Sequence, residues 1–182
     1  MEGIGTRKRY AGRFAAVVAP VAGVLASLPS PAFAMHISEG LLPASWAVLW
    51  YAVAIPFVAL GLRELQRRSE EFPYFKPFVG LVGAAVFLIS CMPIPVPTAG
   101  TCSHPCGTGI AAILIGPGLT VVVASVALTL QALFLAHGGL TTLGANIVAM
   151  GVTGAYVGFG TWLIARRLGV PWVAAAFLAG LL

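Results

Sequence analysis

The feature that most constrains this chain is a long stretch without charge. No Asp, Glu, Lys or Arg occurs between Lys76 and Arg166, and this span is far too long to be one buried core. Over the 182 residues, 8% are charged and 59% are hydrophobic, whereas a soluble domain has about 25% charged residues. The sequence therefore predicts an all-α, polytopic membrane protein that crosses a lipid bilayer several times.

The few charges exclude two classes of function. The formal net charge of +5 comes from short basic clusters such as Arg63/Arg67/Arg68 and Arg166-Arg167. Such clusters mark the edges of membrane spans, and they do not form the basic surface that binds nucleic acid. The acidic residues are five Glu and no Asp. An enzyme that uses paired carboxylates is therefore excluded, and the lipid bilayer is the expected surrounding.

Residues 1–34 are typical of a secretory signal peptide. The basic stretch TRKRYAGR precedes the apolar stretch FAAVVAPVAGVLASL, and the small-x-small tripeptide AFA ends at Ala34. An ordinary first membrane span is the alternative, but the apolar run is short and Pro20 interrupts it. We expect cleavage after Ala34. Met35 would then be the mature amino terminus, on the outer side of a bacterial or archaeal cell membrane.

Residues 35–182 form one domain in this interpretation, with about five or six helices. The expected spans are 41–62, 75–92 and 147–165, and residues 107–136 are apolar but interrupted by the glycines of GPG at 116–118. A single crossing over 107–136 would place Arg166-Arg167 outside. We favour a short helix before GPG and a full helix after it, which places the pair inside. The last segment stops within a hydrophobic run, which indicates a truncated carboxy terminus.

Two short irregular segments fall on the same outer side. One is the start of the mature chain, residues 35–40. The other is the Pro/Gly-rich loop PIPVPTAGTCSHPCGTG, which cannot be regular helix. His36 and His104 therefore share a side of the membrane. Three cysteines are too few for a disulfide framework, although Cys102 and Cys106 would be able to pair in an oxidising compartment.

A free amine at Met35 would itself be a metal ligand. This amine, the deprotonated amide nitrogen of His36 and the His36 imidazole would bind one ion through fused chelate rings. His104 would complete a square of four nitrogens. Square-planar nitrogen ligation suits Ni(II) or Cu(II) and can be adapted to Co(II). We expect no prosthetic group.

Other interpretations of the same residues remain open. Cys102, His104 and Cys106 alternate along TCSHPC and would favour zinc or Cu(I), although Pro105 restricts their geometry. His137 lies among glycines and is predicted to be structural, holding backbone carbonyls. A membrane haem or copper redox protein would use His104 and His137 as ligands. A structural or assembly subunit would bind no ligand.

Three motifs, MHISEGLLPASW, TCSHPCGTGIAAILIGP and LQALFLAHGGLTTLGANIVAMG, resemble the CbiM/NikM family. This family is the substrate-binding (S) component of energy-coupling-factor cobalt/nickel importers. The resemblance implies that the amino-terminal segment folds into the helical core and that Met35, His36 and His104 hold the metal. Structural candidates around these ligands are Glu39, Thr98, Ser103, Cys102, Cys106 and His137.

The resemblance also implies partners and a physiological role. The expected partners are a transmembrane coupling (T) component, two ATP-binding subunits and, in many systems, a small accessory membrane subunit. The chain contains no G-x-x-x-x-G-K-[ST] loop, so it is not itself expected to hydrolyse ATP. Imported cobalt would supply cobalamin biosynthesis. Two departures matter: 34 residues precede the methionine of MHI, so cleavage becomes necessary, and Cys106 stands where the family often has Thr.

Overall fold

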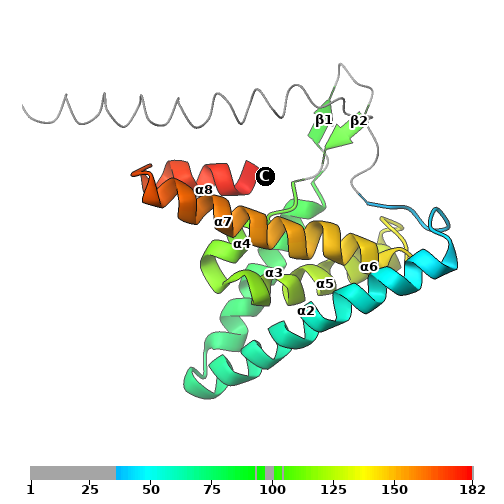
Figure 1. Ribbon diagram of the computed structural model, residues 1–182, viewed down its shortest axis with the longest axis horizontal. Coiled ribbons are helices and arrows are strands. Elements are labelled where there is room, and N and C mark those ends of the chain that lie inside the picture. Colours follow the sequence, from blue (N-terminus) through cyan, green and yellow to red (C-terminus); the bar gives the residue numbers. More distant parts are fainter. Residues whose placement is uncertain (1–35, 93, 97–100, 104, 182) are drawn as a thin grey trace, which may run out of the picture.

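The chain forms a bundle of helices with one short hairpin (Figure 1). The computed structural model describes residues 36–92, 94–96, 101–103 and 105–181, and the predicted signal segment lies outside them. In chain order the elements are α2 (Ala44–Glu71), α3 (Phe75–Ser90), β1 (Ile94–Val96), β2 (Thr101–Ser103), α4 (Thr108–Ile115), α5 (Pro117–Phe134), α6 (Leu143–Asn146), the π-helix η1 (Ile147–Thr153), α7 (Gly154–Arg167) and α8 (Trp172–Leu181). Because α6, η1 and α7 are continuous, the described residues form six helical rods. The predicted all-α fold is confirmed.

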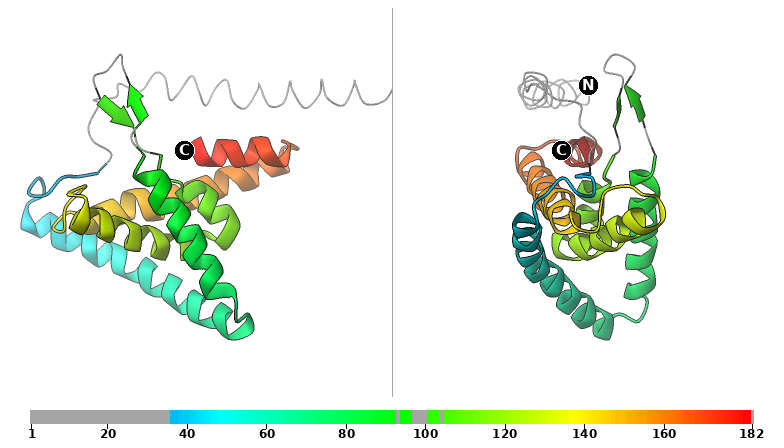
Figure 2. Two further views of the ribbon diagram at one scale, coloured as in Figure 1. Left: turned by 180° about the vertical axis from the view of Figure 1, so that it is seen from behind. Right: turned by 90° about the vertical axis from the view of Figure 1, so that its right-hand side faces the viewer.

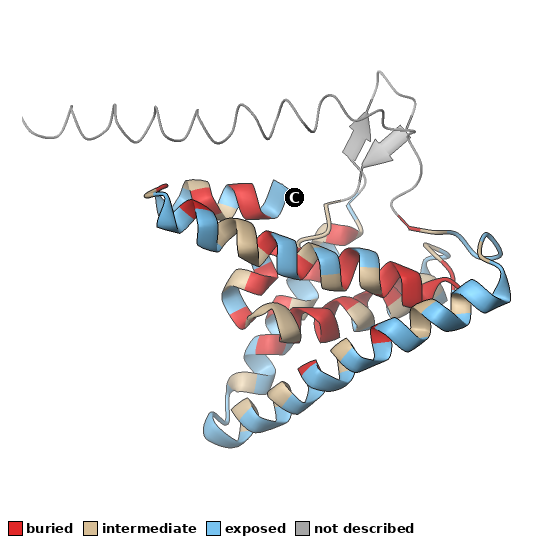
Figure 3. Cartoon of the chain, viewed as in Figure 1, coloured by how far each residue is buried: buried red, intermediate tan, exposed pale blue. Residues whose placement is uncertain are grey.

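Within the described residues, three helices are long and apolar enough to cross a membrane. They are α2, α5 and the continuous rod from Leu143 to Arg167. Figure 3 shows that much of α2 is exposed, and this exposed surface includes Leu49, Ile55 and Leu60. Water would solvate such a surface poorly, whereas lipid tails solvate it well. The structure therefore confirms a protein that crosses the membrane several times.

The antiparallel hairpin β1–β2 occupies the Pro/Gly-rich loop. Its register pairs Ile94 with Ser103, Pro95 with Cys102 and Val96 with Thr101. Residues 105–107 then lead into α4 without regular structure. The prediction that this loop is not helical is confirmed for its described residues up to Gly107, whereas Thr108 and Gly109 already belong to α4.

The predicted break at GPG separates two helices, as we expected. Gly116 has φ of +92°, a conformation that favours glycine, and Pro117 begins α5, where its missing N–H costs nothing. Arg68 on α2 donates to the carbonyl of Ile115 at 3.3 Å, which satisfies one of the carbonyls left open at the end of α4. The Arg68 guanidinium also pairs with Glu64. The last turns of α2 therefore stabilise the break between α4 and α5.

Helix α2 and the continuous rod of α6, η1 and α7 begin at the same end of the bundle. A Cβ atom on Gly144 would lie 2.6 Å from the backbone nitrogen of Tyr51, so the starts of α6 and α2 are in contact. Each rod has basic residues in its last turn, Arg68 in α2 and Arg166 with Arg167 in α7. We call the end at which α2 and α6 begin the His36 end, because His36 lies there, and we call the end with the last turn of α2 the Arg68 end.

Helix α5 is the central helix of the bundle. In its most apolar stretch of 18 residues, 50% of the residues are buried, against 17% in the corresponding stretch of α2. The right-hand view of Figure 2 shows α5 between α2 and α3. One buried cluster joins it to α3 and α4 and another joins it to α2 and η1. The members on α5 are Leu119 and Val123 in the first cluster, and Val121 and Leu128 in the second. Helix α8 folds back along α7 (Figure 2), where Val170 and Leu178 form a smaller cluster.

Replacing Leu119 by Ala should destabilise the bundle, because the side chain is fully buried between α3 and α4. We expect a loss of about 2–5 kcal/mol, typical of a cavity in a packed core. Thermal unfolding in detergent would measure it. The matched control is Leu133→Ala on the same helix, where the leucine is 55% exposed. Equal losses in the two variants would contradict a core centred on α5.

Candidate metal site

His36 is buried at the His36 end of the bundle, although it precedes the first described helix. Its exposed fraction is 4%, whereas residues 38–41 are exposed. The ring Nε2 lies 3.0 Å from Oε1 of Gln131 on α5. The ring also packs edge-to-face against His137, with centroids 4.4 Å apart and planes at 72°. The first described residue of the chain is thus inserted among the helices.

The backbone of the next residue, Ile37, is hydrogen bonded on both sides by side chains. Its N–H donates to Oδ1 of Asn146 at 2.9 Å. Its carbonyl accepts from Oγ1 of Thr142 at 2.6 Å and from Nδ2 of Asn146 at 3.2 Å. Asn146 and Thr142 are both buried. These three bonds replace the helix or strand that would normally satisfy a buried backbone.

The loop between α5 and α6 closes over this segment. Ala136 has φ of 48° and Gly138 has φ of 88°, so the chain turns sharply on both sides of His137. A Cβ atom on Gly139 would lie 2.6 Å from Cα of Glu39. The loop and the amino-terminal segment are therefore in backbone contact.

Glu39, one of the structural candidates, joins the two segments. Its carboxylate accepts from the backbone N–H of Thr141, at 3.1 and 3.3 Å to the two oxygens. This hydrogen bonding to Thr141 holds the pKa of Glu39 below its ordinary value of 4.5, and desolvation opposes the shift. The charged form of Glu39 thus stabilises the contact.

Gln131 continues the polar contacts away from His36. Its Nε2 donates to Oγ of Ser90 at 2.6 Å and lies 3.6 Å from Sγ of Cys91. Ser90 Oγ in turn donates to the carbonyl of Phe87 at 2.9 Å. Gln131 is 1% exposed and Ser90 is 4% exposed, and both line a cavity of about 170 Å³ together with Cys91, Leu135 and His137.

Sequence reasoning missed Gln131, Ser90, Thr142 and Asn146. The available signal was an amide inside an apolar membrane helix, since polar residues at such depth are usually bonded to a functional element. Gln131 in LTLQALF and Asn146 in LGANIV fit that rule.

The remaining predicted residues, apart from Met35, belong to the segment of the sequence between α3 and α4. Cys106 lines a void of about 10 Å³ together with Ser90, Gln131 and Met150, and burial raises the pKa of its thiol. Cys102 and Ser103 are described only as parts of β2. Met35, Thr98 and His104 lie outside the described residues. In the part of the chain that the structure describes, no three His, Cys, Asp or Glu side chains are grouped as a metal site.

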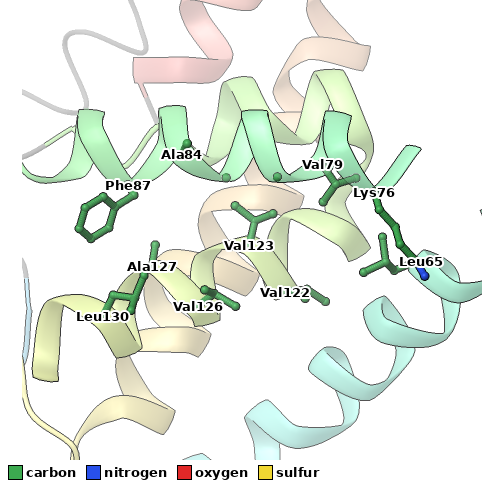
Figure 4. Close-up of a pocket in the computed structure, with 12 residues that line it drawn as sticks. Leu65, Lys76, Val79, Ala84, Phe87, Val122, Val123, Val126, Ala127 and Leu130 are labelled. Carbon is green, nitrogen blue, oxygen red and sulfur yellow. The ribbon is translucent and has the colours of Figure 1, made fainter. Parts of the chain in front are cut away.

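A larger cavity, of about 490 Å³, lies elsewhere, between α3 and α5 (Figure 4). Its lining is apolar, with residues such as Phe87, Val126 and Leu130, and Lys76 is the charged residue at one end. No His, Cys, Asp or Glu lines it. Transition-metal ions need nitrogen, sulfur or oxygen ligands, and the lining of this cavity does not offer such a set.

Residues 36–182 match the family model described as CbiM, cobalt uptake substrate-specific transmembrane region. This match covers most of the chain and includes all three motifs except Met35, the first residue of MHISEGLLPASW. The chain belongs to the CbiM family. The resemblance seen in the sequence is thereby confirmed.

Two curated relatives from the same family are longer than the part of them that this chain matches. The cobalt transport protein CbiM of Geobacter sulfurreducens is 64% identical over 155 residues, which are 85% of this chain and 45% of the relative. The cobalt transport protein CbiM of Sorangium cellulosum is 62% identical over 146 residues, which are 80% of this chain and 65% of the relative. The chain therefore spans less than two thirds of the length of either relative.

Two solved structures have the same fold. A crystal structure of a truncated transition metal transporter gives a TM-score of 0.71 at 27% identity, over 80% of this chain and 66% of that chain. A crystal structure of a transition metal transporter gives 0.71 at 26% identity, over 80% and 63%. The helical arrangement of the CbiM family member described here is thus similar to that of known metal transporters.

Gly139→Ala should push the amino-terminal segment away from the loop. The new Cβ would lie 2.6 Å from Cα and 2.7 Å from N of Glu39, and backbone atoms cannot yield cheaply. We expect a loss of about 1–3 kcal/mol, as for other overpacked sites, measured by thermal unfolding in detergent. Gly80→Ala is the matched control, since a Cβ there meets nothing within 4 Å. Similar melting temperatures for the two variants would argue against a close contact at Gly139.

Acid should weaken the contact between Glu39 and Thr141. Because folding lowers the pKa of Glu39, its stabilising effect is complete above the ordinary value of 4.5 and is lost as pH falls through the lowered pKa. The wild type should therefore melt above Glu39→Gln at neutral pH, and the gap should close in acid. A pH series of melting temperatures measures this. A gap that widens in acid would show that the assigned sign is wrong.

Proposed function

We propose that this chain is the substrate-capture subunit of an ATP-driven importer of the energy-coupling-factor type. It binds a divalent cobalt or nickel ion through the Met35 amine, the amide nitrogen and imidazole of His36, and His104. The observation that carries the proposal is the burial of His36 at the start of the described chain, held at Nε2 by Gln131 at 3.0 Å.

The position of this hydrogen bond suits the chelate. In a histidine that binds metal through its own amide nitrogen, the ring nitrogen nearer the backbone, Nδ1, closes a six-membered ring, and Nε2 is too far away. Gln131 engages Nε2, so the bond and the chelate use different nitrogens of His36. Metal-bound histidines usually have such an outer hydrogen bond on the second nitrogen.

Support for His104 comes from its neighbours in the chain. Cys106 lines the same small void as Gln131 and Ser90. Residues 105–107 therefore pass close to the side chain that holds His36. A nitrogen from His104 would complete the square that Ni(II) favours and that Co(II) tolerates.

The amine requires processing after Ala34, which places the mature amino terminus on the outer side of the cell membrane. The basic last turns of α2 and α7 lie at the ends of these helices opposite to the His36 end. Positive residues favour the cytoplasmic side, so this orientation is consistent with capture from outside.

The name of the relatives, cobalt transport protein, favours cobalt as the cargo. Cobalamin biosynthesis would be the use of that cobalt. The expected partners are the coupling component, two ATP-binding subunits and a small accessory membrane subunit. They would supply the energy, because this chain has no Walker-type phosphate loop.

Blocking cleavage should abolish metal binding, because an amine in a peptide bond is no longer a ligand. We expect Ala34→Asp to leave a membrane-inserted but metal-free chain, while the processed chain binds one ion. The measurement is cobalt and nickel content together with amino-terminal sequencing of the same purified samples. Metal content that is equal in cleaved and uncleaved chains would eliminate the amine as a ligand.

Two histidine variants complete that comparison. His104→Ala in the processed chain should lower metal affinity by orders of magnitude, and His137→Ala should lower it less. The reverse order would overturn the ligand assignment. A Soret band in the purified protein would instead support the haem alternative with His104 and His137.

A further inference from the structure

We propose that Gln131 is a positioning residue that fixes the proton of His36 on Nε2 and so presents Nδ1 to the metal. This inference rests on the proposed function for its metal-binding half. Its structural half, the position of the proton, stands on hydrogen-bond directions within the described residues.

The direction of the polar chain begins at Ser90. Its hydroxyl donates to the carbonyl of Phe87 at 2.9 Å, so its oxygen is left as an acceptor toward Gln131. The Gln131 Nε2 donates to that oxygen at 2.6 Å. Its second hydrogen has the Cys91 sulfur as a weak acceptor at 3.6 Å. The surroundings of Ser90 and Cys91 therefore fix the amide nitrogen of Gln131 on their side.

With the nitrogen so placed, the Gln131 carbonyl oxygen faces His36. A carbonyl oxygen only accepts, so the bond of 3.0 Å requires a hydrogen on Nε2. A neutral imidazole has one ring proton, and this leaves a lone pair on Nδ1. The lone pair lies on the nitrogen that the amino-terminal chelate needs.

Burial makes the arrangement hard to reverse. If the amide were flipped, Ser90 would have to release the Phe87 carbonyl and donate to Gln131, and the His36 proton would move to Nδ1. His36, Gln131 and Ser90 are each at most 4% exposed, so a hydrogen bond lost among them would be costly. The main chain at Gln131 is also fixed, because its carbonyl accepts from the N–H groups of Leu135 and His137.

The experiment measures the His36 tautomer directly, without metal. Solid-state nitrogen-15 spectra of histidine-labelled, processed chain in lipid distinguish a protonated Nε2 from a protonated Nδ1. His104→Asn and His137→Asn variants assign the His36 signals. We expect one His36 species with the proton on Nε2. A proton on Nδ1 in the wild type would overturn the inference.

Variants of Gln131 link the tautomer to the metal. Gln131→Leu should give a mixture of tautomers and weaken nickel and cobalt binding about 10–100-fold, as for other outer partners of ligating histidines. Gln131→Glu keeps an oxygen acceptor for Nε2 and should restore both the tautomer and most of the affinity. Gln66→Leu, at an exposed site on α2, is the matched control and should change neither.

The outcomes separate the two proposals. Unchanged tautomer and affinity in Gln131→Leu would overturn the inference, as would a Gln131→Glu variant that folds but shows no rescue. A wild-type chain that has the Nε2 proton but binds neither metal would instead overturn the proposed function and leave the role of Gln131 in placing the proton intact.

Discussion

The arrangement of the His36 end depends on the two polar groups of the Ile37 backbone. A peptide that enters a helical bundle without regular structure leaves an N–H and a C=O open, and burying either group without a partner is costly. Asn146 satisfies both with one side chain, and Thr142 adds a second donor to the carbonyl. Because these hydrogen bonds fix the backbone of Ile37, the side chain of the adjacent His36 lies within hydrogen-bond distance of Gln131. The loop from Leu135 to Thr142 and the carboxylate of Glu39 then cover a segment that is already fixed.

At the Arg68 end, a charged side chain bonds a backbone carbonyl that a helix leaves open. The break at Gly116 leaves carbonyls of α4 open, and Arg68 reaches one of them while pairing with Glu64. The guanidinium also lies 5.7 Å from the ring centroid of Phe75. Helix α5 begins directly after this break and runs back to Gln131. Both ends therefore use long-range polar bonds where the helices alone leave backbone groups open.

The sequence alone was sufficient for features that depend on composition or on covalent geometry. The uncharged stretch before Arg166 requires lipid as a solvent, and Gly116 with Pro117 requires a helix break, so both predictions are confirmed. The charged residues after residue 62 suggested the edge of a membrane span, and the helix itself continues beyond this point to Glu71.

The polar partners of His36 were out of reach for a different reason. Gln131 and Asn146 act through contacts with residues about a hundred positions away in the chain. Periodicity shows that a residue is polar within an apolar helix, but only the packing of α5 and α6 shows what it faces. His36 was found because its chemistry is local to the amino terminus. The roles of Met35 and His104 stay predictions.

Helix α5 connects the two ends as a single rigid rod. Its first turn packs beside Glu64, since a Cβ on Gly118 would lie 2.6 Å from Oε2 of that residue, and its last turn carries Gln131. At a rise of about 1.5 Å per residue the two points are about 20 Å apart. Over that length, a tilt of a few degrees about the first turn displaces the last turn by about an ångström or more. The hydrogen bond from His36 to Gln131 tolerates little such displacement. A small tilt of α5 at the Arg68 end would therefore change the contact between Gln131 and His36 at the other end.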